Sequence, residues 1–174
     1  MKCRPYTKLS QSRGQSVVEL ALVLPLLVVL MLGLVDLSRA IQAYNIIANM
    51  SREGANLALR TATSIDPQHI MDSLANTAQP LAMTNKGMMY LTKVKKVAGK
   101  IEPELEKIAW GNNQNGTVPP SSYVDDTVPA SIRDTMKDGD IVYVFEVFYQ
   151  YDSLFKASLD YGAFSPQLHS ISIF

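Results

Sequence analysis

Residues that could carry out chemistry are few in this chain, and none stands in a pattern that a known reaction requires. The histidines are His69 and His169, and because the only cysteine is Cys3, a zinc site in the rest of the chain would need acidic ligands at unspecific spacing. The pairs Asp125–Asp126 and Asp138–Asp140 lack the D-x-D-x-D-G order of a calcium loop. No serine occupies a G-x-S-x-G turn, and no phosphate-binding or dinucleotide motif occurs. We therefore expect no enzymatic activity, no metal and no cofactor.

One ionisable residue occupies an unusual position, because Glu19 lies inside the most apolar run of the chain. No charged residue occurs from Leu20 to Val35, and with Val17 and Val18 this run approaches the ~20 residues that a helix needs to cross a bilayer. A carboxylate at the centre of such a helix costs roughly 2.5–3.5 kcal/mol, and less near the interface. An acid in this position indicates a partner or a function.

The segment before the apolar run, residues 1–14, is short, polar and basic. It has no acid and four basic residues: Lys2, Arg4, Lys8 and Arg13. Because positive charge is retained on the cytoplasmic side of a membrane, we expect a cytoplasmic amino terminus and an extracytoplasmic domain from Asp36 onward. Without this leader the chain has 12 basic and 16 acidic residues, a balance that argues against nucleic acid as a partner.

The leader also contains a candidate processing site. An ordinary secretory signal is cut after its apolar region at small residues, and no A-x-A-like stretch follows Val35. The candidate site instead precedes the apolar region, at Gly14, with Glu19 as the fifth residue after it. This arrangement resembles that of type IV pilin-like proteins, in which a prepilin peptidase cuts after the glycine. The resemblance implies a new amine on Gln15 that neutralises Glu19 in lipid, on the same or a neighbouring subunit; the alternative is an uncleaved signal anchor.

We expect a transmembrane helix over residues 15–36 that continues as a helix to about Thr63. Pro25 removes a backbone hydrogen bond within the span, so a kink is expected near it. Beyond the span, apolar residues recur every three or four positions, as in a helix with one packed face: Leu37, Ala40, Ile41, Tyr44, Ile47, Ala48, Ala55, Ala58 and Leu59.

A polar and small-residue segment interrupts this stripe, and its central members are Arg52, Glu53, Gly54 and Ala55. Glycine costs about 1 kcal/mol relative to alanine in a helix interior, so close approach of another element is the better explanation for Gly54. We therefore predict a helix-packing site at these four residues.

Two motifs together give the chain a specific resemblance to a known family. The run GQSVVELALVLPLL, followed by SREGANLA at Ser51–Ala58, resembles the TadE-like family of minor pilins or pseudopilins of the Tad (tight adherence, Flp-type) pilus. The resemblance covers Arg13–Leu59, and it departs from the family pattern at Leu20, where an aromatic residue is common.

The resemblance implies a part in assembly of a Tad-type type IV pilus in the bacterial inner membrane, with Glu19 and Pro25 as assembly residues. The implied partners are a prepilin peptidase, other Tad minor pilins and the major pilin, the inner-membrane assembly platform and the lipid bilayer.

The remainder, residues 37–174, is predicted to be one extracytoplasmic α+β domain in which a small antiparallel sheet packs on the long helix. Asp66 and Pro67 predict the cap and first residue of a second helix, which ends before Pro80. Alternating apolar residues predict strands, the second of them an edge strand because it contains Pro103: 87–97, 101–110, 141–151 and 168–174. Met89, Leu91 and Val94 alternate with lysines, which predicts one buried face for the first strand. The face of the third strand that starts at Ile141 and ends at Tyr151 is expected to lie on the long helix.

A long segment rich in Asn, Gly, Pro and Ser, residues 111–129, is a loop by composition. It supports a second hypothesis from a different class: an uncleaved, signal-anchored binding module of the envelope that holds a ligand on this loop. A periplasmic enzyme is a third hypothesis, which the lack of a catalytic motif disfavours.

Overall fold

The longest element of the chain is α1 (Ser12–Thr61), which carries the apolar run described above. The computed structural model describes residues 12–61, 66–103, 108–111, 134–154 and 167–174. The chain divides into two compact units, Met1–Arg39 and Ala40–Phe174, and α1 contributes residues to both. The helix and the antiparallel sheet confirm the predicted α+β fold class.

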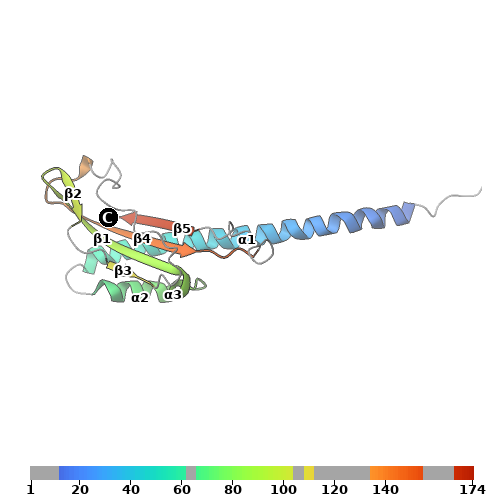
Figure 1. The fold of residues 1–174 in the computed structure, drawn as a ribbon, viewed down its shortest axis with the longest axis horizontal. Helices are drawn as coiled ribbons and strands as arrows, with labels where there is room; N and C mark the ends of the chain where they lie inside the picture. The colour runs from blue at the N-terminus through green and yellow to red at the C-terminus, as the bar shows by residue number, and fades with distance from the viewer. Residues whose placement is uncertain (1–11, 62–65, 104–107, 112–133, 155–166) are drawn as a thin grey trace, which may run out of the picture. The chain divides into compact units, whose positions relative to one another are not determined.

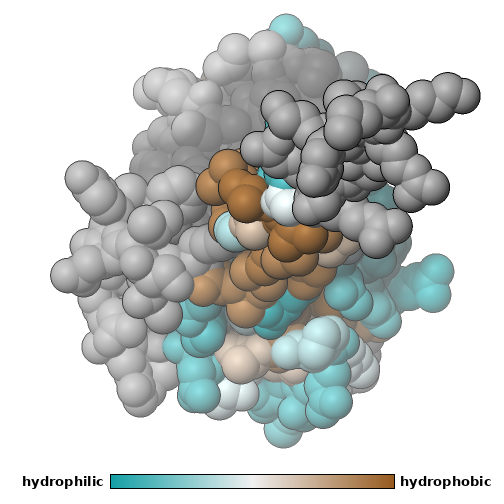
Figure 2. All heavy atoms as spheres, turned by 90° about the vertical axis from the view of Figure 1, so that its right-hand side faces the viewer, coloured by the Kyte–Doolittle hydropathy of each residue, from teal (hydrophilic) through white to brown (hydrophobic). Residues whose placement is uncertain are grey.

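The apolar side chains of α1 in the first unit are exposed. Every large hydrophobic residue from Val17 to Val35 is exposed, and hydrophobic side chains occupy the centre of the face seen in Figure 2. Such exposure is unfavourable in water at about 25 cal/mol per Å², whereas lipid removes this cost. Within the part of the chain that the structure describes, α1 alone has the length and composition of a membrane-spanning helix. It continues through Pro25, and the kink expected there stays a prediction.

The second unit is built on an antiparallel sheet with strand order β2-β1-β4-β5, in which β3 also pairs with β1 (Figure 1). The strands are β1 (Gly87–Val97), β2 (Lys100–Pro103), β3 (Ile108–Trp110), β4 (Ile141–Gln150) and β5 (Gln167–Ile173). The strand predicted at 101–110 is therefore two short strands, β2 and β3, and residues 104–107 lie outside the described part. Because β4 occupies the other edge of β1, Pro103 lies on an edge strand, as predicted.

The hydrophobic core lies between one face of this sheet and the helices. That face carries Met89 and Leu91 of β1, opposite Val147 and Phe145 of β4, and Tyr149 further along β4. Against it pack α2 (Pro67–Thr77), α3 (Met83–Lys86) and the part of α1 after Arg39, whose buried apolar residues are Ala43, Ile47, Met50, Ala55 and Ala58.

This buried stripe of α1 differs from the predicted one. Ile41, Tyr44 and Leu59 were expected in it, yet they are about half exposed, at 53%, 49% and 49%. Ala43 and Met50, which the spacing did not select, are buried instead. Successive residues of a helix are about 100° apart, so the spacing of apolar residues alone does not determine which of two adjacent faces is packed. Contact with the sheet decides which face of α1 is buried.

The opposite face of the sheet is also buried at its centre, which corrects the single buried face predicted for β1. Tyr90 and Thr92 are buried on β1, and Val144, Glu146 and Phe148 are buried beside them on β4. Val94 belongs to this second face, since it differs by an odd number of positions from Met89 and Leu91. The lysines of β1 lie toward the end of the strand and are partly exposed: Lys93, Lys95 and Lys96.

The cap of α2 forms as predicted, with Pro67 at the first helical position. The Asp66 carboxylate accepts a hydrogen bond from the backbone N–H of Gln68 at 3.0 Å. Ile70, Met71 and Leu74 are the residues that this helix buries. The Trp110 indole N–H donates to the Asp72 carboxylate at 2.6 Å, so the only tryptophan of the chain links α2 to the sheet.

Replacing Asp66 with alanine is expected to destabilise the second unit by about 1 kcal/mol, because one N–H of the first helical turn then lacks its acceptor. The Asp66→Asn variant keeps a capping oxygen and is expected to lie close to the parent protein. Urea unfolding of the full chain in detergent, followed by Trp110 fluorescence, measures both. Equal unfolding midpoints for the alanine and asparagine variants would contradict the capping role.

Candidate functional site

The candidate processing and assembly residues lie in the part of α1 that belongs to the first unit: Gly14, Gln15 and Glu19 near its start and Pro25 further along. Gly14 and Gln15 are exposed residues of the first turns, and a Cβ added at Gly14 meets no atom within 4 Å. The Gln15 side-chain amide donates to the Glu19 carboxylate at 3.1 Å, as residues four apart do on one helix face. The two residues that the sequence paired are thus neighbours, and the Gln15 backbone nitrogen lies one helical turn from Glu19.

The four candidate packing residues divide into two faces of α1 in the second unit. Arg52 and Glu53 are exposed, whereas Gly54 and Ala55 are buried. The Arg52 carbonyl also accepts a hydrogen bond from the Asn56 side chain at 3.0 Å. Gly54 and Ala55 therefore belong to the packed face of α1, and Arg52 and Glu53 face away from the core.

Gly54 lies against the ring of Phe145 on β4. A Cβ built on Gly54 would lie 2.6 Å from Cε1 and Cζ of Phe145 and 2.7 Å from Cδ1. Phe145 is itself fully buried, with no exposed surface, so its ring has no open space in which to withdraw. The absence of a side chain at position 54 lets α1 approach β4 closely.

A cluster of three buried serines joins α1 to β5 one turn away. The Ser51 hydroxyl lies 2.9 Å from that of Ser170 and 3.0 Å from that of Ser172, and it also lies 3.1 Å from the Ala48 carbonyl, to which it donates. Hydroxyls that are buried without partners are costly, so mutual hydrogen bonding stabilises this arrangement. These hydrogen bonds hold α1 against β5 at the position of Ser51 along the helix.

Beside this cluster the surface is hollowed between α1 and β5. The groove has a volume of about 640 Å³, and α1 lines it with Tyr44, Asn45, Ala48, Asn49 and Arg52. Residues His169 to Ser172 of β5 form the other wall. Among the described residues that line the groove, Arg52 is charged, His169 is titratable and the others are neutral. Arg52 was predicted to be a packing residue, and the groove itself was not predicted from the sequence.

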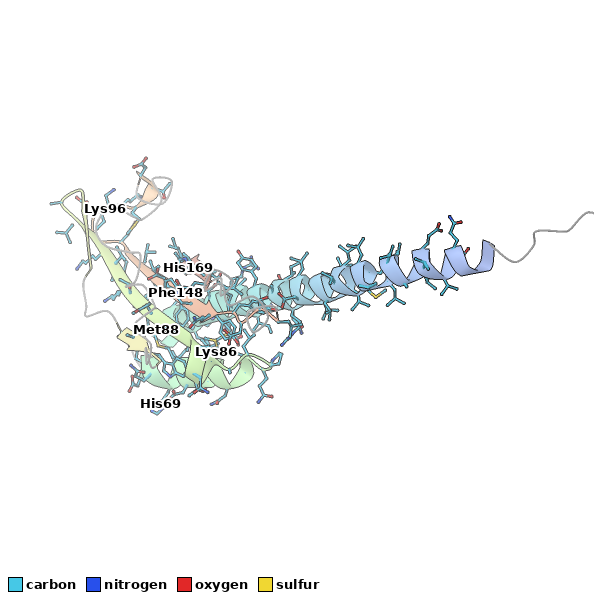
Figure 3. All side chains as sticks on the ribbon, turned by 45° about the vertical axis from the view of Figure 1, so that its right-hand side comes forward. His69, Lys86, Met88, Lys96, Phe148 and His169 are labelled. Carbon is cyan, nitrogen blue, oxygen red and sulfur yellow. The ribbon has the colours of Figure 1, made fainter. Side chains whose placement is uncertain are left out.

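The second face of the sheet holds an aromatic and ionisable group. The rings of Phe148 and His169 stack with centroids 4.2 Å apart and planes 7° apart (Figure 3), and the ring of Tyr90 meets Phe148 edge-on. The Nε2 atom of His169 lies 3.5 Å from Oε1 of the fully buried Glu146. Burial raises the pKa of the Tyr90 phenol, and the Glu146 carboxylate raises it further. The signal for this group was Glu146 itself, a carboxylate inside an otherwise apolar strand.

A second ionic contact lies at the end of the core, where Lys86 of α3 pairs with Asp152 beyond β4. The hydrogen bond that the Lys86 amine donates to the Asp152 carboxylate raises the pKa of that amine. Among the described residues no group of three or more histidine, cysteine, aspartate or glutamate side chains could hold a metal ion. The 111–129 segment proposed as a ligand loop lies outside the described residues except for Gly111.

These features define a class: a protein with one apolar helix suited to membrane anchoring, continuous with a helix that packs on a small antiparallel sheet. Comparison with known proteins adds the family. Residues 14–56 match the family model described as TadE-like protein, and this range lies within the Arg13–Leu59 resemblance. No curated protein and no solved structure matches the chain. Over residues 14–56 the chain is similar to TadE-like proteins, and this similarity associates it with the Tad pilus and with other pilus components as partners.

Proposed function

We propose that this TadE-like protein is a minor pilin or pseudopilin that takes part in assembly of a Tad-type pilus after a prepilin peptidase has cut the chain at Gly14. The observation that carries the proposal is the family match at residues 14–56, which begins at the candidate cleavage site and ends just after Ala55. The exposed apolar helix that follows Gly14 supports it, because cleavage leaves this helix on the mature protein.

The proposed chemistry is a charge neutralisation within lipid. Cleavage after Gly14 gives Gln15 a free amine, and an amine is positively charged at neutral pH because its ordinary pKa is about 8. This amine, on the same or a neighbouring subunit, pairs with the Glu19 carboxylate and removes the cost of an isolated charge in the bilayer. Side-by-side packing of helices in the membrane then follows from a favourable contact between subunits.

The second unit acts, in this proposal, as a presenting domain without enzymatic activity, located outside the cytoplasm. The basic leader supports a cytoplasmic amino terminus in the inner membrane. Prepilin peptidase, the other minor pilins, the major pilin and the inner-membrane platform are the proposed partners, and no nucleic acid is among them.

Amino-terminal sequencing of the protein purified from its native membrane is expected to begin at Gln15. The same protein isolated from cells without prepilin peptidase is expected to retain residues 1–14 and to be heavier by that segment. The Gly14→Leu variant is expected to stay uncut while α1 forms normally, because a side chain at Gly14 meets no neighbouring atom. A sequence that starts at any other residue, or equal masses in the two strains, would contradict processing at Gly14 and favour the uncleaved anchor.

A further inference from the structure

The outer edge of β5 presents backbone groups in a regular order. Tyr143 and Phe174 exchange both N–H···O=C hydrogen bonds, with N···O distances of 2.8 and 3.1 Å. Hydrogen-bonded pairs alternate along an antiparallel ladder, so the next such pairs are Phe145 with Ser172 and Val147 with Ser170. The β5 residues that alternate with these, His169 and Ile171 among them, therefore direct their backbone N–H and C=O groups away from β4. Among the described strands, β5 is the outermost strand on this side of the sheet.

The groove between α1 and β5 lies along this same edge. His169 and Ile171 line it although their side chains belong to the sheet face opposite α1. The small residue Ala48 is among the α1 residues that line the groove. An extended chain placed here would add a strand to the sheet and cover part of α1, which is the mode known as β-strand addition.

The charge of the groove indicates what such a strand carries. Arg52 lines the groove, and no described residue of its lining is acidic. The amides Asn45 and Asn49 are exposed on the same helix face and offer both donors and acceptors. A guanidinium favours a carboxylate over other groups because it offers paired N–H donors, so an acidic side chain complements this wall.

We propose that this groove binds an extended segment of another pilus subunit, which pairs with the outer edge of β5 and places an acidic side chain against Arg52. The inference rests on the proposed function for the identity of its partner. It names a contact made by the second unit, whereas helix packing in the membrane involves the first.

Site-specific cross-linking in native cells tests this. A photoreactive phenylalanine analogue replaces Tyr44, which lines the groove and is 49% exposed; the matched control replaces Leu59, which is also 49% exposed on α1 and lies outside the groove. We expect the Tyr44 probe alone to cross-link to one segment of another pilus subunit, identified by mass spectrometry as containing an aspartate or glutamate. Equal cross-linking from both positions, none from Tyr44, or cross-linking only to a second copy of this chain overturns the proposal.

Variants of the groove separate backbone pairing from mere proximity. Ile171→Pro removes an outward N–H and blocks strand approach, and proline is tolerated on an edge strand where the N–H faces outward. It is expected to lower the cross-link yield about tenfold, while Ile171→Val leaves the yield unchanged. Arg52→Gln is expected to lower it about fivefold and Arg52→Lys less. Unchanged yields with both Ile171→Pro and Arg52→Gln overturn the proposal.

A variant with a bulky residue in the groove keeps the proposal testable if the Ile171→Pro variant fails to fold. Asn49→Trp fills the groove from the exposed helix face and is expected to abolish the cross-link, whereas Asn56→Trp, on the same face but outside the groove, leaves it intact. A retained cross-link with Asn49→Trp overturns the inference. If the proposed function is wrong, the chain stays uncut at Gly14 or normal pili form in the Glu19→Ala variant. If only the groove inference is wrong, the chain is cut after Gly14 and the groove gives no specific cross-link.

Discussion

Replacing Glu19 with alanine is expected to lower the number of assembled pili at least about tenfold while the amount of protein in the membrane stays unchanged. The carboxylate is the costly residue of the apolar helix, at roughly 2.5–3.5 kcal/mol if it were central, so its removal favours insertion. In this variant the Gln15 amine loses its partner and remains as an unpaired charge in lipid, which disfavours assembly. Counting pili by electron microscopy and blotting the membrane fraction give the two measurements.

Two variants make this result specific to charge. Val18→Ala changes the neighbouring exposed residue without altering charge and is expected to assemble normally. Glu19→Gln keeps a polar side chain that can still accept a hydrogen bond from Gln15 but has no charge, and it is expected to behave as the alanine variant does. Normal pili in Glu19→Ala would show that the proposed charge pair plays no part in assembly.

Replacing Gly54 with alanine is expected to destabilise the second unit by about 2 kcal/mol or more, despite the ~1 kcal/mol that alanine gains in helix propensity. The new Cβ would lie 2.6 Å from two ring carbons of Phe145, well inside ordinary contact distance. Because the ring is fully buried, either α1 or β4 has to shift. Gly54→Leu is expected to be more severe, and urea unfolding of the full chain, followed by Trp110 fluorescence, measures both.

Gly33 provides a matched control within the same helix, since a Cβ there meets no atom within 4 Å. The Gly33→Ala variant is expected to leave the unfolding midpoint of the second unit unchanged. Combining Gly54→Ala with Phe145→Leu is expected to cost less than the sum of the two single changes, because the smaller side chain makes room for the methyl group. Additive single effects would mean that the clash with Phe145 is not the cause.

Most elements of the fold were predictable because their signals are local. The bounds of β1, Gly87–Val97, match the predicted strand, and those of α2 follow from Asp66 and Pro67, which act on the first turn of a helix. The turn before β4 contains Gly139, whose positive φ of 95° suits glycine, so this signal is local as well. Such signals involve residues close in sequence, so they need no knowledge of the remaining chain.

The candidate site was predictable only where one element contains it. Glu19 and Gln15 stand on one helix face, so their proximity follows from helical periodicity alone. Gly54 could be recognised as a place of close packing, but its neighbour Phe145 could not be named. Among the packing residues, only the structure distinguishes the buried pair, Gly54 and Ala55, from the exposed pair, Arg52 and Glu53.

By itself the sequence determined that this protein has an apolar helix with one acid near its start, followed by an α+β domain without a recognisable catalytic motif. Its tertiary structure decided which helix face is buried, that the sheet buries both faces, and that β5 and α1 border a groove. The physical reason is distance along the chain: Ser51 meets Ser170 and Ser172 across 119 and 121 residues, and Gly54 meets Phe145. Periodicity shows which residues share a face, whereas only the packing of distant elements shows what that face contacts.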